Sequence, residues 1–201
     1  MKVDLIEAIK ILQRGEIVII PTETVYGVAA LYDNDQAIQK LYTLKSRPYN
    51  KPCTLHLHSK EQIPPFISEY PANAKEIIED CCPGPYTFIL PAHVPATSPL
   101  LRGGKPTIGI RIPAHETTQA LLKATGPLVA SSANLSSHPP LNTLYDIEAV
   151  WGQKLPILTE GEPPHGVSST IIEHTEKGWK CIRQGKETHF FHLQSLYNVF
   201  S

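Results

Sequence analysis

Several features that would assign the chain to a common functional class are missing from its sequence. No apolar run approaches the length of a membrane span, and no basic segment followed by an apolar one opens the chain. The sequence also contains no GxxxxGK[ST], no GxGxxG and no GxSxG. A P-loop, a dinucleotide-binding fingerprint and a serine-hydrolase nucleophile turn are therefore not expected. We expect a cytoplasmic protein that makes no contact with a membrane.

Cysteine and charge are also sparse. The four cysteines contain no CxxC pair, and the adjacency of Cys81 and Cys82 makes a structural disulfide framework implausible. Charged residues make up 18% of the chain and the formal net charge is -1, so no overall field attracts nucleic acid. Contact with RNA would therefore need a local basic patch.

What the sequence does contain is enough apolar material for one folded domain. The chain has 201 residues, of which 41% are hydrophobic, and its 19 prolines predict many fixed turns. Apolar spacing predicts helices over residues 3–14, 35–44, 71–80, 116–124 and 144–151. Short apolar or alternating runs predict strands over residues 17–20, 54–58, 86–90, 107–112, 128–130, 169–173 and 179–183.

The order of these elements predicts the fold class. Helices and strands mix without strict alternation, so we expect a single-domain α/β fold with a twisted mixed sheet and flanking helices. No domain boundary is evident before Arg183. We assign residues 1–185 to this domain and residues 186–201 to a short C-terminal appendage.

Two polar runs are the most informative segments: KSRP at residues 45–48 and SSAN at residues 131–134. Lys45 supplies a mobile charge and Arg47 a planar donor fork, both suited to phosphate oxygens. Ser132 and Asn134 follow an apolar run that reads as a buried strand, and open α/β sheets place ligands at such strand exits. Two cations this close together are also common in a solvated surface patch, which is the alternative interpretation.

The segment PTETVYG at residues 21–27 follows the first predicted strand. Its two hydroxyls, carboxylate and glycine could bind a small polar ligand or a metal-bound nucleotide. Equally, the threonines could cap backbone groups in a strand-to-helix turn. The sequence leaves both interpretations open.

Three further segments carry polar side chains within or beside apolar runs. Arg111 interrupts an apolar strand, where it is costly to bury unless paired, so carboxylate recognition competes with a structural salt bridge. His56 shares a predicted strand face with His58, but no further ligand spacing supports a zinc site. Ser169 opens one late strand and Arg183 ends another.

Taken together, these segments resemble the YrdC/Sua5 family, in its short form. The matching stretches occur in the family's order across nearly the whole chain. They are PTETVYG at 21–27, KSRP at 45–48, PGPYTFIL at 83–90, IGIRIP at 108–113, GPLVASSANLS at 126–136, GVSSTII at 166–172 and IRQG at 182–185.

The resemblance implies a twisted α/β sheet with a large concave cavity. It also implies an ATP-dependent nucleotidyltransferase, an L-threonylcarbamoyladenylate synthase that converts L-threonine, bicarbonate and ATP to threonylcarbamoyl-AMP and pyrophosphate. That product serves the t6A37 modification of tRNA, so tRNA and tRNA-modifying proteins are implied partners. Mg2+ would accompany ATP without a dedicated protein site. The alternative is a paralogue that binds double-stranded RNA or tRNA without synthase activity.

The resemblance also assigns roles residue by residue. It implies Lys45, Arg47, Ser132 and Asn134 as the catalytic and nucleotide-binding set. Arg183 matches an arginine that contacts the nucleotide phosphates. Positions that hold threonine correspond to Thr24, His56, Arg111 and Ser169, with Arg111 at the carboxylate. Thr22 and Tyr26 are candidate neighbours of the substrates.

Overall fold

The computed structural model describes residues 1–136 and 138–186. The strands are β1 (Lys2–Val3), β2 (Val18–Ile20), β3 (Gly27–Leu31), β4 (Thr54–His56), β5 (Tyr86–Pro91), β6 (Thr107–Arg111), β7 (Leu128–Ser132), β8 (Ile157–Leu158), β9 (Thr170–Thr175) and β10 (Gly178–Arg183). The α-helices are α1 (Leu5–Gln13), α2 (Asp35–Leu44), α3 (Ala74–Cys81), α4 (Pro99–Arg102), α5 (Glu116–Thr125) and α6 (Leu144–Trp151). Short 3-10 helices are η1 (Lys60–Gln62), η2 (Pro64–Phe66) and η3 (Val94–Ala96).

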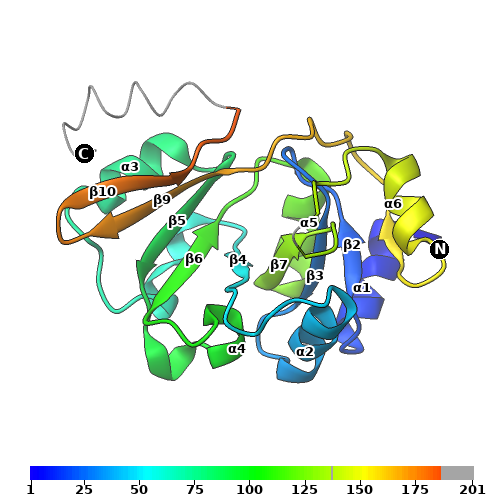
Figure 1. Ribbon diagram of the computed structural model, residues 1–201, viewed down its shortest axis with the longest axis horizontal. Helices are drawn as coiled ribbons and strands as arrows, with labels where there is room; N and C mark the ends of the chain where they lie inside the picture. Colours follow the sequence, from blue (N-terminus) through cyan, green and yellow to red (C-terminus); the bar gives the residue numbers. More distant parts are fainter. Residues whose placement is uncertain (137, 187–201) are drawn as a thin grey trace.

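The ten strands found within residues 1–136 and 138–186 join one mixed sheet in the order β1-β8-β2-β3-β7-β4-β6-β5-β9-β10. β4 pairs in parallel with β6 and antiparallel with β7, so it connects the two halves of the sheet. Figure 1 shows β5, β6, β9 and β10 on one side of β4, and β2, β3 and β7 on the other. The predicted fold class, a single α/β domain with a twisted mixed sheet, is confirmed.

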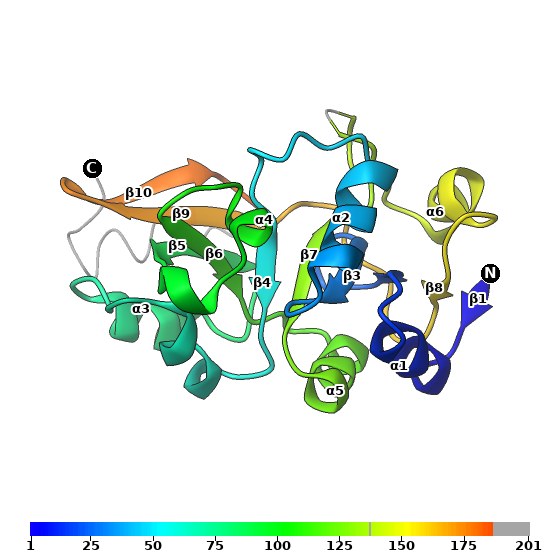
Figure 2. The ribbon, with the colours of Figure 1, turned by 90° about the horizontal axis from the view of Figure 1, so that it is seen from below.

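The two faces of the sheet are covered differently. One apolar cluster joins the face bearing Leu55 and Val129 to α2, α3 and α6. A second, smaller cluster packs α1 and α5 against Ala29, Leu128 and Ala130 on the opposite face. Figure 2 shows α1 and α5 side by side beneath this half of the sheet.

The face that packs against α1 and α5 continues across β4 to the half of the sheet formed by β5, β6, β9 and β10, as the strand register shows. Thr54 is opposite both Ala130 and Gly109, so these three residues share one face. His56 and Arg111 are opposite each other two positions further along. On this half the face carries Thr54, Thr87 and Gly109 together with Ile89 and Ile171, so it is more polar than the apolar face that packs against α1 and α5. The change of composition leaves room for a site on β4, β5, β6 and β9.

Most predicted elements are confirmed, and the boundaries of α2 and α6 match the sequence prediction. Asn34 caps α2, since its side chain accepts a hydrogen bond from the Ala37 N–H. The strand predicted over residues 54–58 ends at His56, so His58 does not share a strand face with it. β3 was not expected, because its sequence GVAAL has little β-branched character and no alternation.

Two other expectations concern the ends and surfaces of the chain. The proposed appendage over residues 186–201 lies outside the described residues, except for Lys186. None of the described helices has the length and apolar character needed to cross a membrane. In the described part of the chain, all four cysteines are free thiols, and Cys53, Cys81 and Cys82 are buried.

Candidate active site

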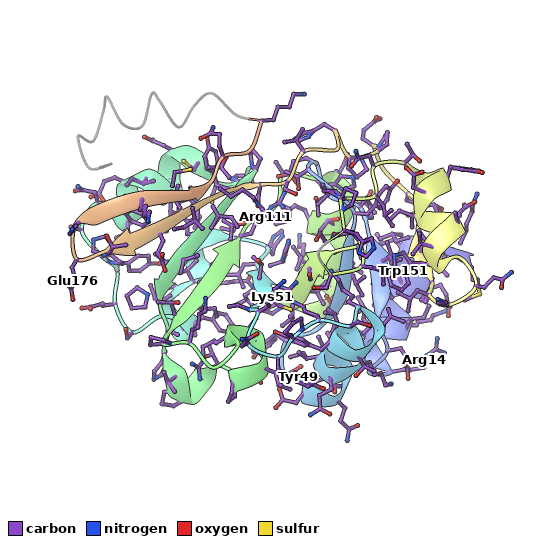
Figure 3. All side chains as sticks on the ribbon, in the orientation of Figure 1. Arg14, Tyr49, Lys51, Arg111, Trp151 and Glu176 are labelled. Carbon is purple, nitrogen blue, oxygen red and sulfur yellow. The ribbon has the colours of Figure 1, made fainter. Side chains whose placement is uncertain are left out.

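A cavity of about 210 Å3 opens where the two halves of the sheet meet, and residues of β3 and β7 line it as well as residues of β4, β5, β6, β9 and β10. It collects residues that are far apart in the sequence, from the loop before β3 to the end of β10. Of the eleven site residues predicted from the sequence, seven line it: Thr22, Arg47, His56, Arg111, Ser132, Ser169 and Arg183. Thr24, Tyr26, Lys45 and Asn134 are not among the lining residues. In Figure 3, Arg111 lies near the centre of the molecule, between the two halves of the sheet.

Arg111 ends β6 with its side chain almost fully buried. Its Nη2 lies 2.9 Å from Glu23 Oε1, and the two side chains are 6% and 19% exposed. Both interpretations of Arg111 therefore apply, because it forms a salt bridge and also lines the cavity. Glu23 was not among the eleven named site residues, although the sequence analysis considered its carboxylate as part of PTETVYG. The sequence could not predict this pair, because no spacing rule links residue 23 to residue 111 and only the fold brings them together.

His56 presents a neutral ring to the cavity. Burial, and secondly the charge of Arg111, lower the pKa of His56 from 6.5 to about 3. Its Nδ1 lies 3.3 Å from the Thr54 carbonyl oxygen. Because a carbonyl can only accept, Nδ1 carries the proton. Nε2 is therefore left as a hydrogen-bond acceptor for a hydroxyl or amine group.

The lowered pKa of His56 predicts how the free energy of unfolding depends on pH in acid. Between pH 6.5 and pH 3 the unfolded chain protonates His56 while the folded chain does not, so the contribution of His56 to stability is lost progressively as the pH falls through this range. We expect His56→Gln to flatten the loss of unfolding free energy measured by urea titration between pH 6.5 and 4. His93 is exposed, so the control variant His93→Gln should show the same loss of unfolding free energy between pH 6.5 and 4 as wild type. Equal acid sensitivity of wild type and His56→Gln would contradict this assignment.

Lys45 lies beneath the cavity rather than in its lining. It is 1% exposed, and its Nζ donates to Ser131 Oγ at 2.8 Å and to the Ser132 carbonyl oxygen. Burial, and secondly the charge of Arg47, lower the pKa of Lys45 from 10.5 to about 8. The ammonium therefore acts on the cavity through Ser131 and Ser132, both of which line it.

Arg47 and Arg183 line the cavity and donate to neutral oxygens. Arg47 Nε donates to the Lys51 carbonyl oxygen at 3.2 Å, and its Nη2 to that of Pro52. Arg183 donates from Nε to the Ser169 carbonyl oxygen at 2.9 Å and from Nη2 to Ser169 Oγ at 3.1 Å. None of these four bonds brings a negative charge to the arginines, so both guanidiniums favour an anionic ligand.

Thr87 on β5 belongs to the site but was not predicted as a site residue. Its Oγ1 lies 2.9 Å from Ser169 Oγ, and the two hydroxyls form a buried pair beside Arg183. Within the apolar sequence YTFIL a single threonine reads as an ordinary strand residue. Only the pairing of β5 with β9 brings it to the cavity.

The remaining predicted residues lie behind or beside the lining. Thr24 is fully buried and its Oγ1 lies 2.9 Å from Thr22 Oγ1, while Tyr26 belongs to the apolar core. Asn134 lies in the loop after β7, where its amide donates to the carbonyl oxygens of Leu135 and His138. These bonds hold the loop in its present shape.

A second cavity of about 180 Å3 continues along the same face. It shares Pro52, Cys53, Thr54, Thr87 and Ile171 with the first and adds Lys105, Thr107 and Glu173. Gly109 lies where the two meet: a Cβ there would contact Thr87 Cγ2 at 3.6 Å and Thr54 Oγ1 at 3.8 Å. Together the two cavities could hold a ligand that is extended along the sheet.

Comparison with known proteins places this arrangement in a family. A family model named Sua5/YciO/YrdC and described as "Telomere recombination" matches residues 10–185. The chain is 38% identical over 182 residues to the threonylcarbamoyl-AMP synthase of Vibrio campbellii, covering 89% of this chain and 97% of that protein. It is 34% identical over 178 residues to the enzyme of the same name from Pyrococcus abyssi, covering 87% of this chain and 52% of that protein.

A solved structure agrees with the sequence comparison. The structure of P. abyssi Sua5 complexed with L-threonine superposes with a TM-score of 0.89 at 29% identity, covering 98% of this chain and 58% of that one. The chain thus spans about half the length of its P. abyssi relative and nearly all of the Vibrio one. The match over residues 10–185, the level of identity and the shared fold lead to one conclusion: the chain belongs to the Sua5/YciO/YrdC family.

Proposed function

We propose that the chain is an L-threonylcarbamoyladenylate synthase, which forms threonylcarbamoyl-AMP and pyrophosphate from L-threonine, bicarbonate and ATP. The observation that carries the proposal is the lining of one cavity by three guanidiniums, those of Arg47, Arg111 and Arg183, beside a neutral His56. Several positive charges in one partly closed site suit a polyphosphate. The names of the relatives, two of which are cited above, supply the identity of the reaction.

The residues support a reaction that depends on positioning and charge. The threonine amine first captures bicarbonate, with release of water, or CO2, with release of a proton to solvent, to give a carbamate. A carbamate oxygen then attacks the α-phosphate, and pyrophosphate leaves. In this scheme Arg111 holds the threonine carboxylate, and His56 Nε2 accepts a hydrogen bond from the threonine hydroxyl. Such a step needs oriented substrates and neutralised charge more than a protein nucleophile.

The nucleotide would occupy the rest of the site. Arg47 and Arg183 neutralise the phosphates, while Ser131 and Ser132, supported from below by Lys45, contact the reacting groups. The second cavity offers room for the nucleoside. The described residues lining the first cavity include no carboxylate, so Mg2+ would travel with the ATP phosphates and not in a protein cage. We further propose that the product serves t6A37 formation on tRNA in the cytoplasm, together with tRNA-modifying proteins.

The alternative, an RNA-binding protein without synthase activity, has less support. The three arginines discussed here lie in a cavity lined by strands and loops, and the net charge of the chain is -1. Non-specific RNA binding depends on several cations that reach backbone phosphates on an open surface.

The direct test is incubation of the protein with ATP, Mg2+, L-threonine and bicarbonate, with measurement of pyrophosphate and of the adenylate by mass spectrometry. We expect both products, and neither when threonine or bicarbonate is omitted. Arg183→Gln should reduce the rate by about tenfold or more, as for loss of a charged phosphate contact. The control variant Arg14→Gln removes an exposed arginine at the end of α1 and should not change the rate. No product from wild type above the Arg183→Gln background would contradict the proposal.

A further inference from the structure

The three cavity guanidiniums differ in whether a carboxylate accompanies them. Arg47 and Arg183 donate to carbonyl and hydroxyl oxygens, which carry no charge. Arg111 instead faces Glu23 at 2.9 Å. The carboxylate oxygens of Glu23 are buried, and in the described part of the chain neither accepts a hydrogen bond of good geometry. Their interaction with Arg111 is therefore chiefly electrostatic.

The loop that carries Glu23 is held firmly in place. Thr22 Oγ1 donates to the Val25 carbonyl oxygen at 2.7 Å and accepts from the N–H groups of Thr24 and Val25. The Glu23 carbonyl oxygen accepts from the His165 N–H at 3.0 Å. A carboxylate on a backbone fixed in this way has little freedom to leave Arg111.

Arg111 lines the cavity, and the described residues do not saturate its guanidinium with hydrogen bonds. Its Nε and Nη2 are buried and make no hydrogen bond of good geometry with the described residues, so the ion pair with Glu23 is the contact that holds the group in place. Arg183 is close enough for the charge of Arg111 to contribute, after burial, to lowering the pKa of Arg183. Without Glu23 these two guanidiniums would form one strongly cationic region, which would attract phosphate to both.

We propose that Glu23 is a positioning and specificity-determining residue: it holds Arg111 and offsets its charge, so that Arg111 accepts the carboxylate of an amino acid and excludes phosphate. Only the identity of that amino acid rests on the function proposed above. The exclusion of phosphate is a property of the charges and can be tested without turnover. Glu23 does not itself line the cavity and acts through Arg111.

The test uses isothermal titration of inorganic phosphate and of L-threonine into wild type and Glu23→Gln. Removal of the charge should tighten phosphate binding at least about fivefold and weaken L-threonine binding at least about fivefold, a size typical of one charged interaction. The double variant Glu23→Gln/Arg111→Met should lose the added phosphate affinity. Glu16→Gln, which breaks an exposed ion pair with Lys40, is the matched control and should change neither affinity.

Glu23→Asp separates the two roles and keeps the proposal testable if the Gln variant fails to fold. It retains the charge but shortens the reach, so phosphate exclusion should persist while L-threonine binding weakens. Tighter phosphate binding in Glu23→Asp would overturn the charge argument, and unchanged L-threonine binding would overturn the positioning argument. Phosphate and L-threonine affinities within twofold of wild type in folded Glu23→Gln would overturn the whole proposal.

Failure of the proposed function would look different. Wild type would then form no adenylate and bind no L-threonine, while the comparison of phosphate affinity between wild type and Glu23→Gln would still decide whether Glu23 offsets Arg111.

Discussion

Replacing Arg111 with methionine is expected to lower the free energy of unfolding by about 3–5 kcal/mol, because it leaves the buried Glu23 carboxylate without its partner. Methionine fills a similar volume, so the effect should come from charge rather than from a void. Urea unfolding monitored by circular dichroism at pH 7 measures it. The variant should also require a much higher L-threonine concentration for any adenylate formation.

A double-variant cycle identifies the cause. Glu23→Gln/Arg111→Met removes both charges and should recover most of the lost stability, since no ion is then left buried alone. Arg14→Met breaks the exposed pair with Glu7 and should cost no more than about 1 kcal/mol. If the double variant is as unstable as the sum of the two single variants, the pair does not interact as described.

Replacing Lys45 with methionine is expected to reduce adenylate formation about 100-fold or more with only a small change in stability. The lowered pKa of about 8 corresponds to roughly 3 kcal/mol against the charged form at neutral pH. Methionine avoids that cost but leaves Ser131 and the Ser132 carbonyl without a donor, at about 1–3 kcal/mol. The two effects nearly cancel. Activity falls because the positive charge beneath the reacting groups is gone.

The pH dependence of Lys45 provides the control. The folded chain releases this proton near pH 8 and the unfolded chain near 10.5, so wild type should gain stability between these values, and Lys45→Met should lack that gain. Adenylate formation by wild type should decline as the pH rises through about 8 and Lys45 loses its charge. A Lys45→Met variant that retains wild-type activity would contradict the role of the charge.

Local sequence was sufficient for much of the secondary structure. The capped amphipathic segment 35–44 and the apolar spacing over 144–151 each specify a helix, and both appear with the expected bounds. β3 escaped prediction because Gly27–Leu31 forms a strand through pairing with β2 and β7 rather than through its own preference.

The candidate site was only partly predictable for a similar reason. Ordered motifs indicated which segments belong together, and seven of the eleven named residues do line one cavity. Lys45 was predicted to contact the nucleotide, with a solvated surface patch as the alternative, but it is buried against the end of β7, where its Nζ donates to Ser131 Oγ. The partnership of Glu23 with Arg111, and of Thr87 with Ser169, depends on strands that are distant in sequence.

The sequence by itself determined the family, the α/β class and the kind of chemistry available, because side-chain types and local periodicity are properties of short segments. Only the tertiary structure decided which charges are balanced. Sheet register sets Arg111 beside His56, and the chain brings Glu23 to Arg111 from the loop before β3. The energy of a buried charge depends on its neighbours in space, which motif order does not specify.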